Sequence, residues 1–295
     1  MVVADLRDRF PALDGWLIQV KGLLDPLRVF LAPQDGALQL AWWSTAGWQF
    51  SCIDLPPDLC SSGHPLNREV LGETIADLLL EKGFSPQQVE IELLLPLPSC
   101  QWRLLEGAAS VGLSCGDDLR ALQPDLGWSL ALEDSYLDVL PLPQADDALV
   151  VGVDRLLLQA WVNTLEAADL SLRRAEWLLT AAWRGLCEAH AGADEHLVWL
   201  VEMAGRWRLL LLRHGCPEVD LSLQASEYPW LRDEVLGLVE AWAPACLPGW
   251  WITAGPQWQG RWIADHDFER GPLRSDGDMS LLDLALKASP GVGDA

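Results

Sequence analysis

Two short clusters of residues combine side chains that can bind metal ions. One is Asp265-His266-Asp267, whose alternate residues would share a face of a strand, and the other is His190, Asp194 and His196 around a glycine-containing loop. Both clusters also suit a polar loop in solvent, which is the commoner role of such residues. We therefore interpret both as loops and predict no metal site.

Other chemistry-bearing patterns are also missing. The sequence lacks the HExxH pattern, the Walker A loop and the Rossmann glycine fingerprint. Redox and zinc sites depend on closely spaced cysteine pairs, but no CxxC occurs among the seven cysteines Cys52, Cys60, Cys100, Cys115, Cys187, Cys216 and Cys246. We expect reduced, mostly buried thiols and therefore a cytoplasmic location.

The charge balance excludes some partners. The chain has 43 acidic and 20 basic residues, which give a formal net charge of −23. Such a surface repels phosphate backbones and anionic lipids, so we expect no nucleic-acid partner. It suits a basic partner such as the cytoplasmic juxtamembrane tail of a membrane protein. The alternative is that the acidity only keeps the protein in solution.

No segment predicts insertion into a membrane. No apolar run reaches the roughly 18 residues that a spanning helix needs. The N-terminal sequence MVVADLRDRF has no basic region followed by an apolar one, so we expect no signal peptide.

The 17 tryptophans are unusually many, and some are adjacent. Neighbours on a strand point to opposite faces. One member of Trp42-Trp43 and one of Trp250-Trp251 should therefore face another layer, a partner or solvent.

The series of strands and helices that could position a site occurs twice along the chain. The length of the chain allows one large domain or two modest ones. Residues 28–95 predict a hairpin (28–31 and 37–43), a third strand (47–53), a helix (67–82) capped by Gly83, and a strand (89–95). Residues 196–254 predict the same series: a hairpin (196–203 and 206–213), a third strand (218–223), a helix (228–243) and a strand (250–253). A last helix is predicted over residues 279–287.

Between the copies, residues 101–175 predict strand, helix (117–122), strand, strand, helix, strand, the order of the ferredoxin-like motif. Asp154 can cap its second helix, whose apolar stripe contains Leu158, Trp161, Val162 and Leu165. We expect the strands at 148–153 and 170–174, which flank this helix, to pair side by side.

The segment Asp147 to Gly185 resembles the PilM family, the actin-like cytoplasmic components of type IV pilus assembly. In that family too an apolar strand leads into a helix ending Leu-Glu-Ala-Ala-x-Leu, here Leu165 to Leu170. The resemblance implies an α/β actin-like (ribonuclease H-like) fold of two lobes with an inserted ferredoxin-like subdomain. The expected boundaries are 1–97 for the first actin-like subdomain, 98–175 for the inserted subdomain and 176–295 for a shortened second one.

The resemblance also implies a nucleotide site, which this chain has lost in part. In actin-like proteins the Asp-x-Gly hairpins hold phosphates through N–H groups and Mg²⁺ through carboxylates. The candidate cofactor-binding residues are Asp35 and Gly36 in the first hairpin, Glu202 and Gly205 in the second, and Gly255 in the third loop.

Each of these loops departs from the family pattern. Pro33 removes an N–H donor, Gln39 stands near the position of the family's lysine, and Ala254-Gly255 replaces a Gly-Gly pair. A further family subdomain is reduced here to Cys216–Tyr228. The site is therefore expected to be degenerate, with no catalytic residue, and with ATP and Mg²⁺ binding weakened or lost.

The expected function is that of a cytoplasmic scaffold in type IV pilus assembly or related secretion or DNA-uptake machinery. It would hold the cytoplasmic N-terminal tail of a PilN-like inner-membrane protein, in a groove between the region of residues 67–82 and the inserted subdomain. Its location would be cytoplasmic, peripheral at the inner membrane through this partner. The alternatives are a nucleotide-binding actin-like ATPase that uses Asp35 and Glu202, and a small-molecule binding protein with a tryptophan-rich cleft. Self-association remains open.

Overall fold

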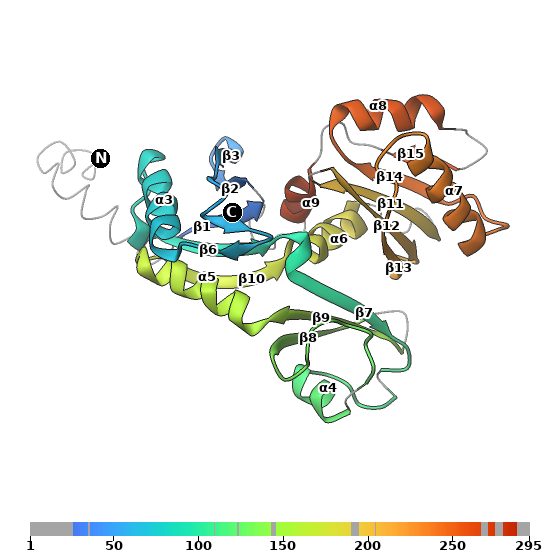
Figure 1. Cartoon of the computed structure of the whole chain (residues 1–295), viewed down its shortest axis with the longest axis horizontal. Helices are drawn as coiled ribbons and strands as arrows, with labels where there is room; N and C mark the ends of the chain where they lie inside the picture. The colour runs from blue at the N-terminus through green and yellow to red at the C-terminus, as the bar shows by residue number, and fades with distance from the viewer. Residues whose placement is uncertain are drawn as a thin grey trace, which may run out of the picture. The chain divides into compact units, whose positions relative to one another are not determined.

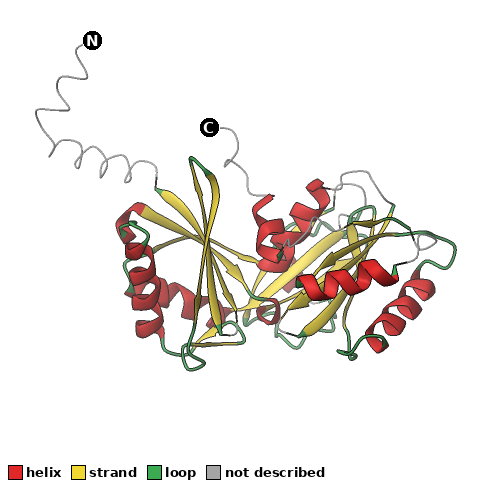
Figure 2. Cartoon of the chain, turned by 90° about the horizontal axis from the view of Figure 1, so that it is seen from above, coloured by secondary structure: helices red, strands yellow, loops and turns green. Residues whose placement is uncertain are grey.

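The computed structural model describes residues 26–34, 36–108, 110–122, 124–142, 146–189, 195–203, 205–266, 271–274 and 280–287. Packing divides the chain into two compact units. The first lies within Met1–Gln101, Gly127–Leu137 and Gly152–Trp177, and the second within Trp102–Leu126, Asp138–Val151 and Leu178–Ala295. Figure 1 labels the elements of each unit, and Figure 2 distinguishes helices from strands.

The first unit contains a five-stranded sheet in the order β10-β6-β1-β2-β3. Its strands are β1 (Leu27–Gln34), β2 (Ala37–Ser44), β3 (Gly47–Asp54), β6 (Val89–Leu95) and β10 (Ser171–Trp177). The first three form an antiparallel meander, whereas β6 runs parallel to both β1 and β10. The predicted hairpin, third strand and following strand are confirmed.

Helices α3 (Arg68–Glu81) and α5 (Arg155–Ala167) also belong to the first unit. The side chain of Asn67 caps α3 by accepting the N–H of Val70, and the predicted cap residue Gly83 has a φ of +85° after the helix. The predicted cap of α5 is confirmed as well, because Asp154 accepts the N–H of Leu156 at 2.7 Å.

The two helices pack tightly against each other. A Cβ added to Gly72 of α3 would lie 2.6 Å from the carbonyl oxygen of Thr164 in α5, so the backbones approach closely at this glycine. On α5, Trp161 and Leu165 of the predicted stripe are buried. Leu157 is buried instead of Leu158, so the buried stripe begins one residue earlier than predicted.

Short elements connect these parts. They are β4 (Cys60–Ser61), β5 (His64–Pro65) and the 3₁₀ turns η1 (Pro86–Gln88) and η2 (Leu97–Ser99). The indole N–H of Trp161 donates to the carbonyl of Gly63 at 2.8 Å, which fixes the β4–β5 hairpin against α5.

The inserted segment forms a three-stranded sheet in the order β7-β9-β8. Its elements are β7 (Cys100–Leu105), α4 (Gly116–Leu122), β8 (Ser135–Pro141) and β9 (Ala148–Asp154). The predicted order of elements through residue 177 is confirmed.

The predicted pairing of the strands that flank α5 is wrong. β9 lies between β7 and β8, whereas β10 pairs in parallel with β6 of the first sheet. Charge fixes this choice, because Arg173 and Arg174 on β10 pair with Glu90 and Glu92 on β6 at 2.8 and 2.7 Å. The inserted sheet therefore does not include the last predicted strand, while the other expected domain boundaries stay predictions.

The second unit repeats the first topology in a sheet of order β13-β12-β11-β14-β15. Its strands are β11 (His196–Met203), β12 (Arg206–Arg213), β13 (Cys216–Ser222), β14 (Gly249–Thr253) and β15 (Leu273–Arg274). Its helices are α6 (Leu178–Ala189), α7 (Trp230–Trp242), α8 (Pro256–Asp265) and α9 (Leu281–Lys287). In both sheets the chain order from one edge is third, second, first, fourth and fifth strand, which confirms the predicted repeat. Neither α8 nor β15 was predicted.

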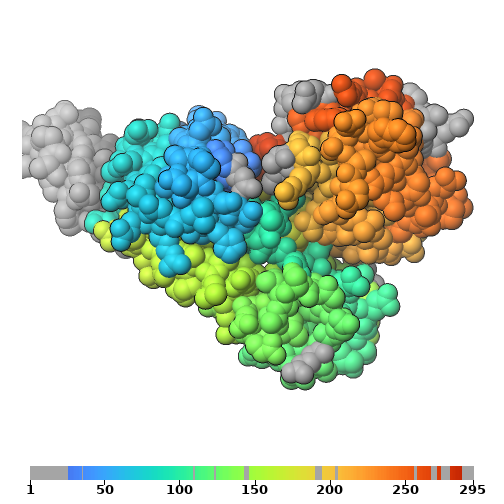
Figure 3. Space-filling model, viewed as in Figure 1, coloured from blue at the N-terminus to red at the C-terminus, as the bar shows by residue number. Residues whose placement is uncertain are grey.

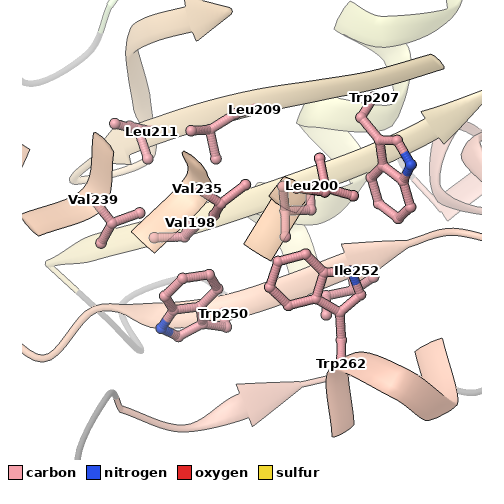
Figure 4. Close-up of a cluster of buried hydrophobic side chains, with 11 residues drawn as sticks. Val198, Leu200, Trp207, Leu209, Leu211, Val235, Val239, Trp250, Ile252 and Trp262 are labelled. Atoms are coloured by element: carbon pink, nitrogen blue, oxygen red, sulfur yellow. The ribbon is translucent and has the colours of Figure 1, made fainter. Parts of the chain in front are cut away.

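The core of the second unit is rich in tryptophan. Figure 4 shows Trp250 and Trp262 among aliphatic side chains of β11, β12 and α7. Trp251, the neighbour of Trp250, is equally buried on the other face of β14. One member of this pair thus faces a second packed layer, as one of the alternatives predicted, whereas Trp43 of the other pair is 42% exposed.

Helices α6 and α9 make a second close backbone contact. A Cβ on Gly185 would lie 1.8 Å from the carbonyl oxygen of Leu284, so only glycine fits here. None of the helices in the described ranges combines the length and the apolar character required to cross a lipid bilayer.

Candidate functional site

The turn between β11 and β12 contains two of the predicted nucleotide residues, Glu202 and Gly205. Gly205 has a φ of +75°, as a tight turn requires. Its N–H donates to the carboxylate of Glu202 at 2.8 Å. The amide that would hold a phosphate is thus already paired within the turn, and so is the carboxylate that would face Mg²⁺.

Gly255 lies at the same end of this sheet. β11 and β14 are parallel and Val201 pairs with Thr253, so both chain segments continue from the sheet side by side. Gly255 precedes α8, and its carbonyl accepts the N–H groups of Trp258 and Gln259. Pro256 begins the helix and has no N–H, which leaves this loop one donor short for a phosphate.

The first hairpin belongs to the other unit. Asp35 lies outside the described residues. Gly36 has a φ of +78°, and its carbonyl accepts the N–H of Leu55 at 2.9 Å. Gln39, near the expected lysine position, accepts a hydrogen bond from Gln34 at 3.2 Å. This hairpin is therefore tied to its own neighbours as well.

The structure thus brings Glu202, Gly205 and Gly255 to one end of the second sheet, and it places Gly36 in the first unit. Phosphate binding needs several free N–H donors that converge, and Mg²⁺ needs free carboxylates. Among the described groups of these loops, the N–H of Gly205 and the carboxylate of Glu202 are bonded to each other, and Pro256 offers no N–H. Within the part of the chain that the structure describes, no group of three His, Cys, Asp or Glu residues could hold a metal ion.

Of the two metal-type clusters, the structure describes Asp265, His266 and His196. Nε2 of His266 lies 2.7 Å from the carbonyl oxygen of Gly271, so this ring nitrogen has a hydrogen-bond partner within the protein. Asp267, His190 and Asp194 lie outside the described residues.

The segment Gly112–Gly116 matches the nucleophile pattern GxSxG, which the sequence interpretation overlooked. That pattern needs a strand before the serine and a histidine base near it. Here Ser114 follows a turn, and its hydroxyl donates to Asp118 at 2.8 Å at the start of α4. The hydrogen bonds from Ser114 lower the pKa of Asp118, so this serine stabilises a helix start.

A second candidate site is a surface of the first unit that we call the apolar face. It consists of four exposed apolar side chains at the beginnings of α3 and α5 and on β8. They are Leu66 (57% exposed), Val70 (42%), Tyr136 (46%) and Leu156 (78%).

These residues form two pairs, Leu66 and Val70 at the start of α3 and Tyr136 and Leu156 where β8 meets the start of α5. The two helices lie side by side in Figure 1, with Gly72 near the start of α3 against Thr164 and Ala168 at the end of α5. The guanidinium of Arg155 lies 5.5 Å from the ring centre of Tyr136, and its Nε donates to the carbonyl of Ser135, which fastens β8 to the start of α5.

The same segments have exposed carboxylates, namely Glu69, Glu73, Glu133, Asp134 and Asp138. Apolar side chains within a negative border fit a peptide that combines apolar and basic residues. The sequence predicted the region of this site but none of its lining residues. A usable signal was present, because Leu66, Val70 and Leu156 lie off the buried stripes of their helices.

Comparison with solved structures identifies the fold. A chain of the PilM-PilN type IV pilus biogenesis complex matches with a TM-score of 0.60 at 14% identity, over 90% of this chain and 99% of that chain. A protein of actin-like ATPase fold and unknown function from Bacteroides thetaiotaomicron matches with a TM-score of 0.58 at 8% identity, over 90% and 96%. The cytoplasmic domain of EpsL, an inner-membrane component of the type II secretion system of Vibrio cholerae, matches with a TM-score of 0.50 at 16% identity, over 89% and 93%.

At these identities the likeness concerns the fold, and the chain has the predicted actin-like fold. No protein-family model and no curated protein sequence matches the chain.

Proposed function

We propose that this protein is a PilM-like scaffold of type IV pilus assembly or a related secretion or DNA-uptake system. It would bind the cytoplasmic N-terminal tail of a PilN-like inner-membrane protein and so be held at the cytoplasmic side of that membrane. The observation that carries the proposal is the apolar face, since Tyr136 and Leu156 are exposed where the inserted segment joins α5, and Leu66 and Val70 are exposed at the start of the neighbouring helix α3. The resemblance of residues 147–185 to the PilM family and the match to a PilM-PilN chain support it.

The binding mechanism follows from the residues of the face. Leu156 and Tyr136 would bury apolar side chains of the tail, and burial of one such side chain contributes about 1.5–3 kcal/mol. The surrounding carboxylates would attract the basic residues that flank a membrane span. The proposal includes no phosphoryl transfer. It is supported in this by the bond between Gly205 and Glu202 and by the missing N–H of Pro256.

Titration with synthetic tail peptides from membrane-anchored neighbours tests this proposal. Leu156→Asp and Val70→Asp should each weaken binding about tenfold or more, since they put a charge on an apolar contact. Leu80→Asp is the matched control, because Leu80 is 55% exposed at the other end of α3. Equal loss in all three variants, or no binding by the unmodified protein, would contradict the proposal.

The alternative, a nucleotide-binding ATPase, is separated by calorimetric titration with Mg-ATP. We expect no heat of binding at micromolar protein. Micromolar affinity for Mg-ATP, lost in Glu202→Ala, would favour the alternative.

A further inference from the structure

β3 forms the outer edge of the first sheet. It pairs with β2 over its whole length from Gly47 to Asp54 without a shift of register. In the ranges that the structure describes, no other strand covers its outer side. Natural edge strands discourage pairing with lysine, proline or a bulge, and β3 has none of these. Its free backbone groups are therefore available for another strand.

Aromatic side chains accompany this free edge, and we call Trp43, Trp48 and Phe50 the edge patch. Phe50 is 51% exposed and Trp43 is 42% exposed. Trp43 pairs with Trp48 across the two strands, with ring centres 5.4 Å apart. The ring centre of Trp48 lies 5.6 Å from that of the buried Phe30, and this contact fixes the position of the patch. In Figure 3 the blue segment that contains β2 and β3 forms part of the visible surface.

The distribution of charge indicates which kind of partner could pair with the free edge of β3. From Val29 to Ile53 the sequence contains one charged residue, Asp35, although 21% of the whole chain is charged. Two copies with a net charge of −23 each repel one another over most of their surfaces. They can approach closely where little charge meets at the contact, and the exposed Asp54 at the end of β3 is the one charged residue of this strand.

A basic partner, in contrast, would find a single carboxylate on this strand, that of Asp54 at its end. The edge therefore differs from the apolar face, whose segments have several exposed carboxylates. A two-fold axis also makes two copies of one edge strand run antiparallel, which satisfies both sets of free backbone groups.

We propose that this protein forms a symmetric dimer through β3, in which the two first sheets join into one continuous sheet and the edge patches cover each other. This inference is independent of the proposed function. It uses a different surface of the first unit and a different occupant.

Sedimentation velocity of the full chain over a range of concentrations tests the dimer. Phe50→Lys should raise the dimer dissociation constant about a hundredfold, because two lysines and their unpaired charges would meet at the interface. The matched control is Leu80→Lys, which adds the same charge at a similarly exposed position on α3 and should leave association unchanged. A monomer at every concentration, or equal weakening by both variants, overturns the proposal.

A second measurement needs no variant. Amide hydrogen exchange in β3 should slow as the protein concentration rises, whereas exchange in β13, the outer strand of the second sheet, should not change. If exchange in β3 does not depend on protein concentration, the proposal is overturned. This outcome does not depend on whether Phe50→Lys folds.

Discussion

The two five-stranded sheets have the same topology and both have apolar cores and cross-strand ion pairs, but these differ in kind and place. In the first sheet, the parallel pair β6–β10 is joined by ion pairs between Arg173 or Arg174 and Glu90 or Glu92. In the second, the corresponding last strand β15 has two residues, the ion pair of Arg208 with Asp220 joins β12 to β13, and the core on one face is rich in tryptophan. One topology thus accepts both solutions, so each unit must be tested at its own contacts.

The two units also differ in whether a segment is inserted after the fourth strand of the sheet. The first sheet accepts an inserted segment between β6 and α5, and this insertion provides β8 and Tyr136 to the apolar face. At the equivalent place in the second unit, the chain passes from β14 through Ala254-Gly255 directly into α8. Both units have a buried apolar core, and the insertion adds exposed surface to the first.

The largest expected effects come from one carboxylate in each unit, the partly buried Asp220 and the buried Glu92. Asp220 on β13 accepts hydrogen bonds from Arg208 and from the indole of Trp102. Asp220→Ala should lower the free energy of unfolding by about 3 kcal/mol, because it leaves both donors without this partner. Glu92→Ala should cost about 2 kcal/mol, since Arg174 keeps a contact with Glu176 at 3.4 Å.

Urea denaturation followed by circular dichroism measures these losses. Asp117→Ala is the control, because its pair with Arg120 is exposed and should contribute less than about 0.5 kcal/mol. A cost for Asp220→Ala as small as that of the control would show that its partners find water instead.

The tripeptide Val-Leu-Gly occurs in the corresponding helices α3 and α7, which gives a sharper comparison. Gly72 lies against the backbone of α5, whereas Gly237 has open space around its Cβ position. Gly72→Ala should destabilise by about 2 kcal/mol, because the helices must separate. Gly237→Ala should stabilise by about 0.5–1 kcal/mol, because alanine favours the helix. Urea denaturation of both variants measures these changes in unfolding free energy. A change of the same sign in both variants would contradict the surroundings assigned to Gly72 and Gly237.

Alkaline pH should affect the second unit through a buried thiol. Burial, together with the nearby Cys216 and Glu188, raises the pKa of Cys187 from 9.0 to about 12. The folded state holds this proton more tightly than the unfolded chain, so the stabilisation is complete below about pH 9 and is lost as the pH rises towards 12. We expect unfolding free energy to fall by about 1 kcal/mol between about pH 8 and pH 10.

Tyr228 responds in the same direction, because burial and a hydrogen bond from its hydroxyl to Asp265 raise its pKa to about 12. Cys187→Ala should remove most of the loss near pH 10 and leave that of Tyr228 at higher pH. An unchanged pH profile in Cys187→Ala would contradict this assignment.

The smallest expected effect concerns the two hairpin turns. Glu202→Ala removes the acceptor of the Gly205 N–H, but water can replace it, so the cost should be about 0.5 kcal/mol. Gln39→Lys restores the family's residue in the other hairpin and should have a similarly small effect on stability. Neither variant should bind Mg-ATP in calorimetry, because each changes one of several groups that a phosphate site needs.

Local signals made most elements predictable from the sequence. The caps Gly83 and Asp154 and the stripe of α5 follow from local backbone geometry, hydrogen bonding and helical period within a few residues. The repeat of hairpin, third strand, helix and strand was predicted because each piece is local. By contrast, α8 was not predicted, because Pro256 and Gly260 obscure its helical pattern.

The errors came from contacts between distant segments. The order of elements around β9 and β10 fits either one sheet or two, and only the pairing of Arg174 with Glu92, 82 residues away, decides between them. The candidate site shows the same limit. The positions of Glu202, Gly205 and Gly255 were predicted, but the bond that uses the carboxylate of Glu202 depends on the geometry of the turn.

The neighbouring positions of β7 and β9 have a consequence for the architecture of the chain. The insertion departs and returns through adjacent strands, so a short linker from Leu97 to Arg155 would leave every strand of both large sheets in the chain. The order of strands in the two large sheets therefore does not depend on which segment is inserted between β6 and α5.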